Sequence, residues 1–137
     1  MASSGMITAE ERRQLLDAAR GAVKNAYAPY SGLRVGAGLL TRQGHLFSGV
    51  NVENASFSLT ICAERAAIAA AVAREGASMR IRALAVVNEA MTPCSPCGAC
   101  RQAILELGPE AVVIFPGPEG LEERKVTELL PLAFRLP

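Results

Sequence analysis

The sequence predicts an α/β protein with a three-layer α/β/α sandwich built on a mixed five-stranded sheet. Two strand-like segments joined by a tight turn come early in the chain, which is typical of an antiparallel hairpin. Helical and strand-like segments then alternate, which is typical of parallel strands with helices on both faces of the sheet. The chain has 137 residues, half of them hydrophobic, which suffices for one domain spanning residues 1–137.

The elements are expected from local signals. A first helix should run from Thr8 to Asn25, because Glu11 three residues after Thr8 completes a capping box. A Gln43-Gly44 turn should join the first two strands, and His45 beside it is expected to be a solvated hairpin residue. The other expected elements are strands at 33–41 and 45–51, a helix at 61–74, a strand at 81–88, a helix from Pro96 to about Leu107, a strand at 111–115, a short strand near Arg124 and a helical turn at 127–130.

Charge and composition exclude several classes of partner. The net charge is +1 and basic residues form no stripe, which disfavours binding to a nucleic acid polymer. No apolar stretch approaches the roughly 20 residues that cross a membrane, so no membrane association is expected. The first residues lack the pattern of a signal peptide. We therefore expect a cytoplasmic protein that acts on a small molecule.

All four cysteines lie in two short segments, Cys62-Ala63-Glu64 and the run from Cys94 to Cys100. In a reducing cytosol, clustered cysteines more often bind metals or act in catalysis than form disulfides. Buried free cysteines, a disulfide and a redox-active CxxC motif are the alternatives.

A predicted helix start divides the second cysteine segment. Ser95 suits the N-cap and Pro96 the first helical position, so Cys97 and Cys100 should share one face of the first turn. Cys62 lies near the start of the preceding helix. The positive ends of two helices favour thiolates over thiols. Three thiolates can hold one tetrahedral Zn²⁺ and leave its fourth position open for water, as in catalytic zinc sites.

Glu64 and Arg65 follow Cys62 closely. A carboxylate beside a metal-bound water is well placed to accept and pass on its proton, so Glu64 is the candidate catalytic residue. Three thiolates and Zn²⁺ sum to −1, which disfavours ionisation of the water. We expect Arg65 to offset this charge by donating hydrogen bonds to the thiolates. Cys94 precedes the predicted helix and is expected to be a bystander.

Motifs spread over nearly the whole chain form one pattern. They are Ala26 to Ser31, Val35-Gly36-Ala37, Asn51 to Asn54, Cys62 to Arg65, Pro96 to Gln102, and Glu128 to Pro131 with Phe134. The pattern resembles that of the small homotetrameric, zinc-dependent cytidine deaminases. The resemblance implies a cytidine-deaminase-like fold, one Zn²⁺ per subunit, a homotetramer, and deamination of cytidine and 2′-deoxycytidine in pyrimidine salvage.

The resemblance also implies roles for individual residues. A metal-activated water would attack C4 of cytosine, and Glu64 would protonate N3 and then the leaving amino group, releasing ammonia and uridine or 2′-deoxyuridine. Asn51 and Glu53 would bind a ribose hydroxyl, and two such groups spaced two apart in an extended segment share a face. The backbone N–H of Ala63 would contact the pyrimidine carbonyl.

The sequence departs from the family pattern at two positions. Leu33 stands where many members have a Phe that stacks on the base, and an aliphatic side chain loses the aromatic contribution. We expect weaker substrate binding, or a different residue over the base, such as Phe134 of a neighbouring subunit. Cys94 has no usual counterpart in the family. Arg101 and Gln102 are expected to be structural.

Two other functions are consistent with parts of this pattern. A deaminase of the same fold could act on another small aminopyrimidine such as blasticidin S, although the ribose pair Asn51 and Glu53 favours cytidine. A non-enzymatic zinc module would need a fourth protein ligand, for which Cys94 is the one candidate, and it would have no use for Glu64.

Overall fold

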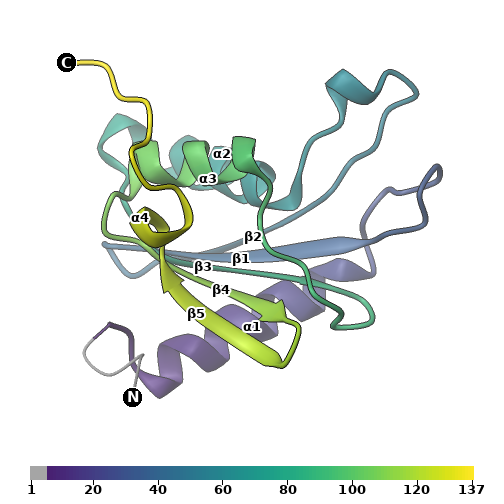
Figure 1. Ribbon diagram of the computed structural model, residues 1–137, viewed down its shortest axis with the longest axis horizontal. Coiled ribbons are helices and arrows are strands. Elements are labelled where there is room, and N and C mark those ends of the chain that lie inside the picture. Colours follow the sequence, from purple (N-terminus) through teal and green to yellow (C-terminus); the bar gives the residue numbers. More distant parts are fainter. Residues whose placement is uncertain (1–5) are drawn as a thin grey trace.

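The computed structural model describes residues 6–137, which form a five-stranded sheet between helices on its two faces (Figure 1). The elements are α1 (Ala9–Val23), β1 (Val35–Thr41), β2 (Leu46–Val50), η1 (Phe57–Leu59), α2 (Ala63–Glu75), η2 (Gly76–Ser78), β3 (Ile81–Asn88), α3 (Gly98–Leu107), β4 (Val112–Gly117), β5 (Gly120–Lys125) and α4 (Val126–Leu129). The strand order is β2-β1-β3-β4-β5. Only the β3–β4 pair within it is parallel. The predicted mixed sheet in an α/β fold is confirmed.

The sheet separates two hydrophobic clusters. One cluster packs the sheet against α2 and α3, and the other packs it against α1 (Figure 1). Successive residues of a strand point to opposite faces, so Leu84 and Val86 join the first cluster while Ala85 and Val87 join the second. Gly38 of β1 allows a very close approach, since a Cβ there would lie 2.5 Å from a backbone carbonyl of α1. These contacts give the predicted three layers.

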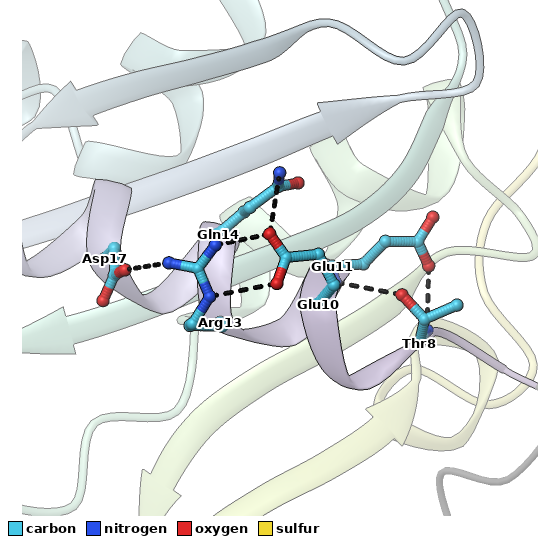
Figure 2. A network of polar contacts seen from close by, with 6 residues as sticks. All are labelled: Thr8, Glu10, Glu11, Arg13, Gln14 and Asp17. Carbon is cyan, nitrogen blue, oxygen red and sulfur yellow. Dashed lines mark hydrogen bonds and ion pairs between the residues drawn. The ribbon is translucent and has the colours of Figure 1, made fainter.

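Helix α1 begins as expected. The Thr8 hydroxyl accepts a hydrogen bond from the Glu11 N–H at 3.0 Å, and the Glu11 carboxylate accepts one from the Thr8 N–H at 2.9 Å (Figure 2). On the solvent side, Arg13 pairs with Glu10 and with Asp17 (Figure 2). At 15 residues α1 is the longest of the described helices. Within residues 6–137, no helix combines the length and apolar character that crossing a lipid bilayer requires.

The hairpin forms where it was predicted, and His45 beside its turn has a side chain that is 39% exposed, but this side chain is also paired. Its Nδ1 lies 2.6 Å from a carboxylate oxygen of Glu75, the last residue of α2. The Glu75 side chain is only 2% exposed and also accepts a hydrogen bond from the Thr41 hydroxyl at 2.6 Å. This pairing was not predicted, because the partner lies 30 positions away, where the end of α2 meets the hairpin.

Two loops bring the beginnings of α2 and α3 together. Before α2, Val52 and Ile61 exchange two backbone hydrogen bonds of 2.9 Å, which fixes the entry to the helix. Before α3, the Asn88 side chain closes a turn on Thr92, and the Cys94 N–H donates to the Pro116 carbonyl at 2.9 Å. The segments that lead into both helices are therefore anchored by backbone or side-chain hydrogen bonds.

Candidate active site

Three of the four cysteines meet at the two helix starts. Cys62 is the N-cap of α2, Cys97 is the N-cap of α3, and Cys100 lies in the first turn of α3. Their sulfur atoms all lie within 4.8 Å of one another. Sulfurs that bind Zn²⁺ tetrahedrally at about 2.3 Å are about 3.8 Å apart, so small side-chain movements suffice to close this group on one ion. The donor set fits zinc.

The start of α3 differs from the prediction. Ser95 is not the N-cap, and Pro96 is not the first helical residue, because Cys97 still has an extended backbone with ψ at 168°. The first helical residue is Gly98, and the Arg101 N–H donates to the Cys97 carbonyl at 2.9 Å. Cys97 and Cys100 still lie on the same side of the helix start, since one is the N-cap and the other is the third helical residue.

Arg65 lies beside the sulfur cluster. One of its terminal nitrogens is 3.5 Å from the Cys62 sulfur and 3.3 Å from the Thr60 carbonyl. Its buried Nε has no hydrogen-bond partner within residues 6–137. A guanidinium with spare donors suits a site that gathers negative charge.

The thiols of Cys62 and Cys100 differ in pKa. A hydrogen bond from Cys100 and the neighbouring Arg65 lower the pKa of Cys62 to about 5. The pKa of Cys100 is raised, because it holds the proton that Cys62 accepts and because it is buried. A metal ion would displace that shared proton, since coordinated cysteines are thiolates.

Glu64 is a buried carboxyl group next to the cluster. Its residue is only 5% exposed. Burial raises the pKa of Glu64 above its usual range, and the charge of Cys62 adds to the rise. A carboxyl group with a raised pKa exchanges protons more readily near neutral pH. It lines a cavity of about 180 Å³ whose other walls are Val35, Asn51, Thr60, Cys62, Ala63, Val86, Cys94, Ser95 and Cys97.

Cys94 belongs to the cavity but not to the sulfur cluster. It is half-buried and lines the same space as Glu64. The group of metal-ligating side chains found among the described residues contains the other three cysteines without it. Burial and the nearby Glu64 raise the pKa of the Cys94 thiol. Cys94 is thus a neutral wall of the cavity.

Asn51 and Glu53 hold the loop that leads into β1. The Asn51 amide accepts from the Val35 N–H at 2.9 Å and donates to the Leu33 carbonyl at 2.8 Å. The Glu53 carboxylate accepts hydrogen bonds from the Ser31 hydroxyl and from two backbone N–H groups, and the Ser31 hydroxyl contributes most to lowering the pKa of Glu53. Asn51 lines the cavity, whereas Glu53 lies outside its lining.

Of the three other residues predicted to contact the substrate, only Ala63 lines the cavity. Ala63 is fully buried and lines the cavity. Leu33 is 53% exposed and is not among the lining residues. Phe134 is 71% exposed and lies against α3, where its carbonyl accepts from Gln102 at 3.0 Å. Within one chain, neither Leu33 nor Phe134 covers the cavity.

The sequence did not identify Thr60, Ser95, Val35 and Val86 as cavity walls. Thr60 and Ser95 each lie two residues before a cysteine that caps a helix. Residues two apart in an extended segment share a face, so this spacing could have identified both. Val86 lies in the middle of a buried strand and carries no comparable signal.

Three thiols meet at two helix starts, and two of them, Cys62 and Cys97, line a cavity together with a buried carboxyl group. This arrangement on an α/β/α fold defines a metal-dependent hydrolytic enzyme. Residues 9–116 match the family described as "Cytidine and deoxycytidylate deaminase zinc-binding region". The chain belongs to this zinc-binding deaminase family.

Individual relatives agree with this assignment. The chain is 44% identical over 126 residues to a cytidine deaminase of Halalkalibacterium halodurans, an alignment that covers 90% of this chain and 94% of the relative. The crystal structure of cytidine deaminase from Mycobacterium tuberculosis superposes with a TM-score of 0.82 at 38% identity, covering 92% of this chain and 98% of the other. A blasticidin-S deaminase of Bacillus cereus is 32% identical over 107 residues, covering 73% and 76% of the two chains.

Proposed function

We propose that this protein is a zinc-dependent cytidine deaminase that hydrolyses cytidine and 2′-deoxycytidine to uridine and 2′-deoxyuridine with release of ammonia. Cys62, Cys97 and Cys100 would hold one Zn²⁺. When bound, the ion supplies a Lewis acid that makes water nucleophilic near neutral pH. Glu64 would take the first proton from that water and deliver it to N3 of the base. It would then transfer the remaining proton, from the new hydroxyl at C4, to the departing amino group, so that ammonia leaves and the C4 carbonyl forms.

The other cavity residues orient the substrate in this proposal. The Ala63 N–H, at the positive start of α2, would donate to the carbonyl oxygen of the base. Asn51 keeps one amide hydrogen and one carbonyl lone pair beyond its two loop contacts, so it can bind a ribose hydroxyl while holding β1 in place. Glu53, Leu33 and Phe134 lie outside the cavity lining. They can contact the substrate only if the bound nucleoside reaches beyond this cavity, or if a neighbouring subunit adds residues to the site.

The observation that carries the proposal is the burial of Glu64 in the cavity that Cys62 and Cys97 of the sulfur cluster line. A structural zinc module has no need of a buried carboxyl group there, and it would need a fourth protein ligand. Cys94, the one candidate for that ligand, lies outside the sulfur cluster. Among substrates, cytidine is favoured over blasticidin S by the higher identity to a cytidine deaminase, 44% against 32%.

The assembly proposed is a cytoplasmic homotetramer acting in pyrimidine salvage. An exposed aromatic pair beside Glu53 supports subunit contact. Tyr30, whose N–H binds the Glu53 carboxylate, meets Phe57 edge to face, and the two residues are 55% and 74% exposed. Exposed apolar groups of this size favour association. Light scattering should give the mass of four chains.

Zinc content and cytidine-to-uridine conversion of the wild type and Glu64→Gln test the function. The variant should retain zinc and lose activity by roughly 10²-fold or more, because Gln cannot transfer the proton. Asp17→Asn is the matched control, since Asp17 is an exposed acid on α1, on the other face of the sheet. Zinc-loaded wild type that leaves cytidine unchanged would refute the proposed activity.

A further inference from the structure

Arg101, in the second turn of α3, contacts two separate parts of the chain. Its Nε donates to the Pro96 carbonyl at 2.7 Å, one terminal nitrogen donates to the Leu129 carbonyl at 2.8 Å, and the other lies 3.3 Å from the Ser95 hydroxyl. The side chain is partly buried at the first two contacts. These contacts connect the loop before α3 to the end of α4.

The contacts of Arg101 converge on the peptide units around Cys97. The Pro96 carbonyl belongs to the peptide bond that enters Cys97, and the Cys97 carbonyl belongs to the one that leaves it. The Arg101 side chain binds the first carbonyl. The second carbonyl accepts the ordinary helical bond from the Arg101 backbone N–H at 2.9 Å, so only the first contact depends on the arginine side chain. These two peptide planes set the direction of the Cys97 Cα–Cβ bond, and the χ1 rotamers of the sulfur start from that bond.

Cys97 has most need of such support among the three cysteines. Cys100 is buried inside the first turn of α3, and Cys62 has Arg65 beside its sulfur. Cys97 is exposed, and its side chain makes no capping hydrogen bond to the helix. Pro96 before it has no N–H with which to anchor the loop.

The contact with Leu129 fixes the guanidinium itself. The last carbonyls of a helix lack intrahelical partners, so the Leu129 carbonyl at the end of α4 is a free acceptor. A planar guanidinium reaches acceptors in several directions at once, which a lysine ammonium on its flexible stem does not. α4 therefore serves as a fixed support from which Arg101 holds the loop.

We propose that Arg101 is the positioning residue for the metal ligand Cys97, and that it slows release of zinc by holding the Pro96–Cys97 peptide against the end of α4. The inference rests on the proposed zinc site. It differs from the expected role of Arg65, which acts on ligand sulfur rather than on the ligand's backbone.

The test compares wild type with Arg101→Ala, Arg101→Lys and the control Arg42→Ala. Arg42 forms an exposed ion pair with Glu110 and lies outside the cavity lining. Zinc release into a chromogenic chelator is timed well below the melting temperature. The absorption of Co²⁺-substituted protein reports the number of bound thiolates.

Loss of groups that orient metal ligands typically weakens metal binding 10- to 100-fold, so Arg101→Ala should release zinc about tenfold faster or more. Arg101→Lys should be intermediate, and Arg42→Ala should match wild type.

The outcomes separate the possible failures. If Arg101→Ala or Arg101→Lys melts at a lower temperature but releases zinc at the wild-type rate with an unchanged Co²⁺ spectrum, Arg101 is merely structural and the proposal is overturned. If Arg101→Ala does not fold, the release rate of Arg101→Lys decides. A wild type that binds no zinc contradicts the proposed function itself, before any variant is compared.

Discussion

Cys94 and Cys97 lie three positions apart and are chemically identical, yet they occupy different environments. Cys97 caps α3 and belongs to the sulfur cluster, while Cys94 is held on the end of β4 and forms a neutral wall of the cavity. The difference follows from where α3 begins. A CxxC motif therefore does not by itself identify a pair of ligands.

The two cysteines should respond differently to serine. Cys94→Ser should keep a full zinc content, because its sulfur is not among the three that meet. Cys97→Ser should lose most of the metal, because a neutral hydroxyl replaces a thiolate ligand. Atomic absorption of the purified proteins measures this. Loss of zinc from Cys94→Ser would show that the ligand set is wrong.

The positions of reactive side chains could be predicted where the residues lie in one short sequence motif. The cysteine cluster and Glu64 follow from helix starts and sequence spacing. The two hydrogen bonds by which Asn51 holds the segment before β1 could not be predicted. Its partners Leu33 and Val35 are 18 and 16 positions away and meet it only after the hairpin forms. The pairing of His45 with Glu75 escaped prediction for the same reason.

At the scale of elements, the order and type of every predicted helix and strand are confirmed, and the differences lie at their ends. α2 and α3 each begin two residues later than predicted, at Ala63 and Gly98. Both begin directly after a cysteine of the cluster. Propensity rules identify Ser, Thr, Asp and Asn as N-caps and do not anticipate cysteine in that position.

The packing of β2 against α2 depends on Gly49. A Cβ at this position would lie 2.5 Å from the Ala63 carbonyl and 2.5 Å from the Ala67 N–H. Gly49→Ala should lower the free energy of unfolding by about 1–3 kcal/mol, because backbone must shift. It should also reduce zinc content, since the displaced residue Ala63 lies between Cys62 and Glu64.

Gly21→Ala is the matched comparison for Gly49→Ala. Gly21 lies in α1, and a Cβ added there would have no neighbouring atom within 4 Å, so alanine should stabilise the helix by about 0.5–1 kcal/mol. Urea unfolding of both variants measures the two effects. Equal stability of the two variants would mean that β2 and α2 are not in tight contact.

At the scale of the whole molecule, the His45–Glu75 contact ties the hairpin to the far end of α2. The Thr41 hydroxyl, followed by His45, lowers the pKa of Glu75 below its usual value of 4.5. A carboxyl group with a lowered native pKa stabilises the fold above its unfolded pKa, and that contribution is lost as the pH falls through the native pKa.

Glu75→Gln should therefore be less stable than wild type at pH 7, and the difference should shrink as the pH falls below about 4.5. Chemical unfolding at a series of pH values measures the difference between the two proteins. Glu110→Gln is the control, because Glu110 is 80% exposed in its ion pair with Arg42 and such pairs contribute little. A difference between wild type and Glu75→Gln that stays constant with pH would exclude the ionised Glu75 as its source.

The charges on one edge of the sheet bear on aggregation. The outermost strand on one side, β5, carries four successive charged residues, Glu122 to Lys125. Three of them form ion pairs, Glu123 with Arg12 of α1 and Arg124 with Glu122. A foreign strand that docked along this edge would have to desolvate or break these pairs. The charged β5 strand thus protects the open end of the sheet from edge-to-edge polymerisation.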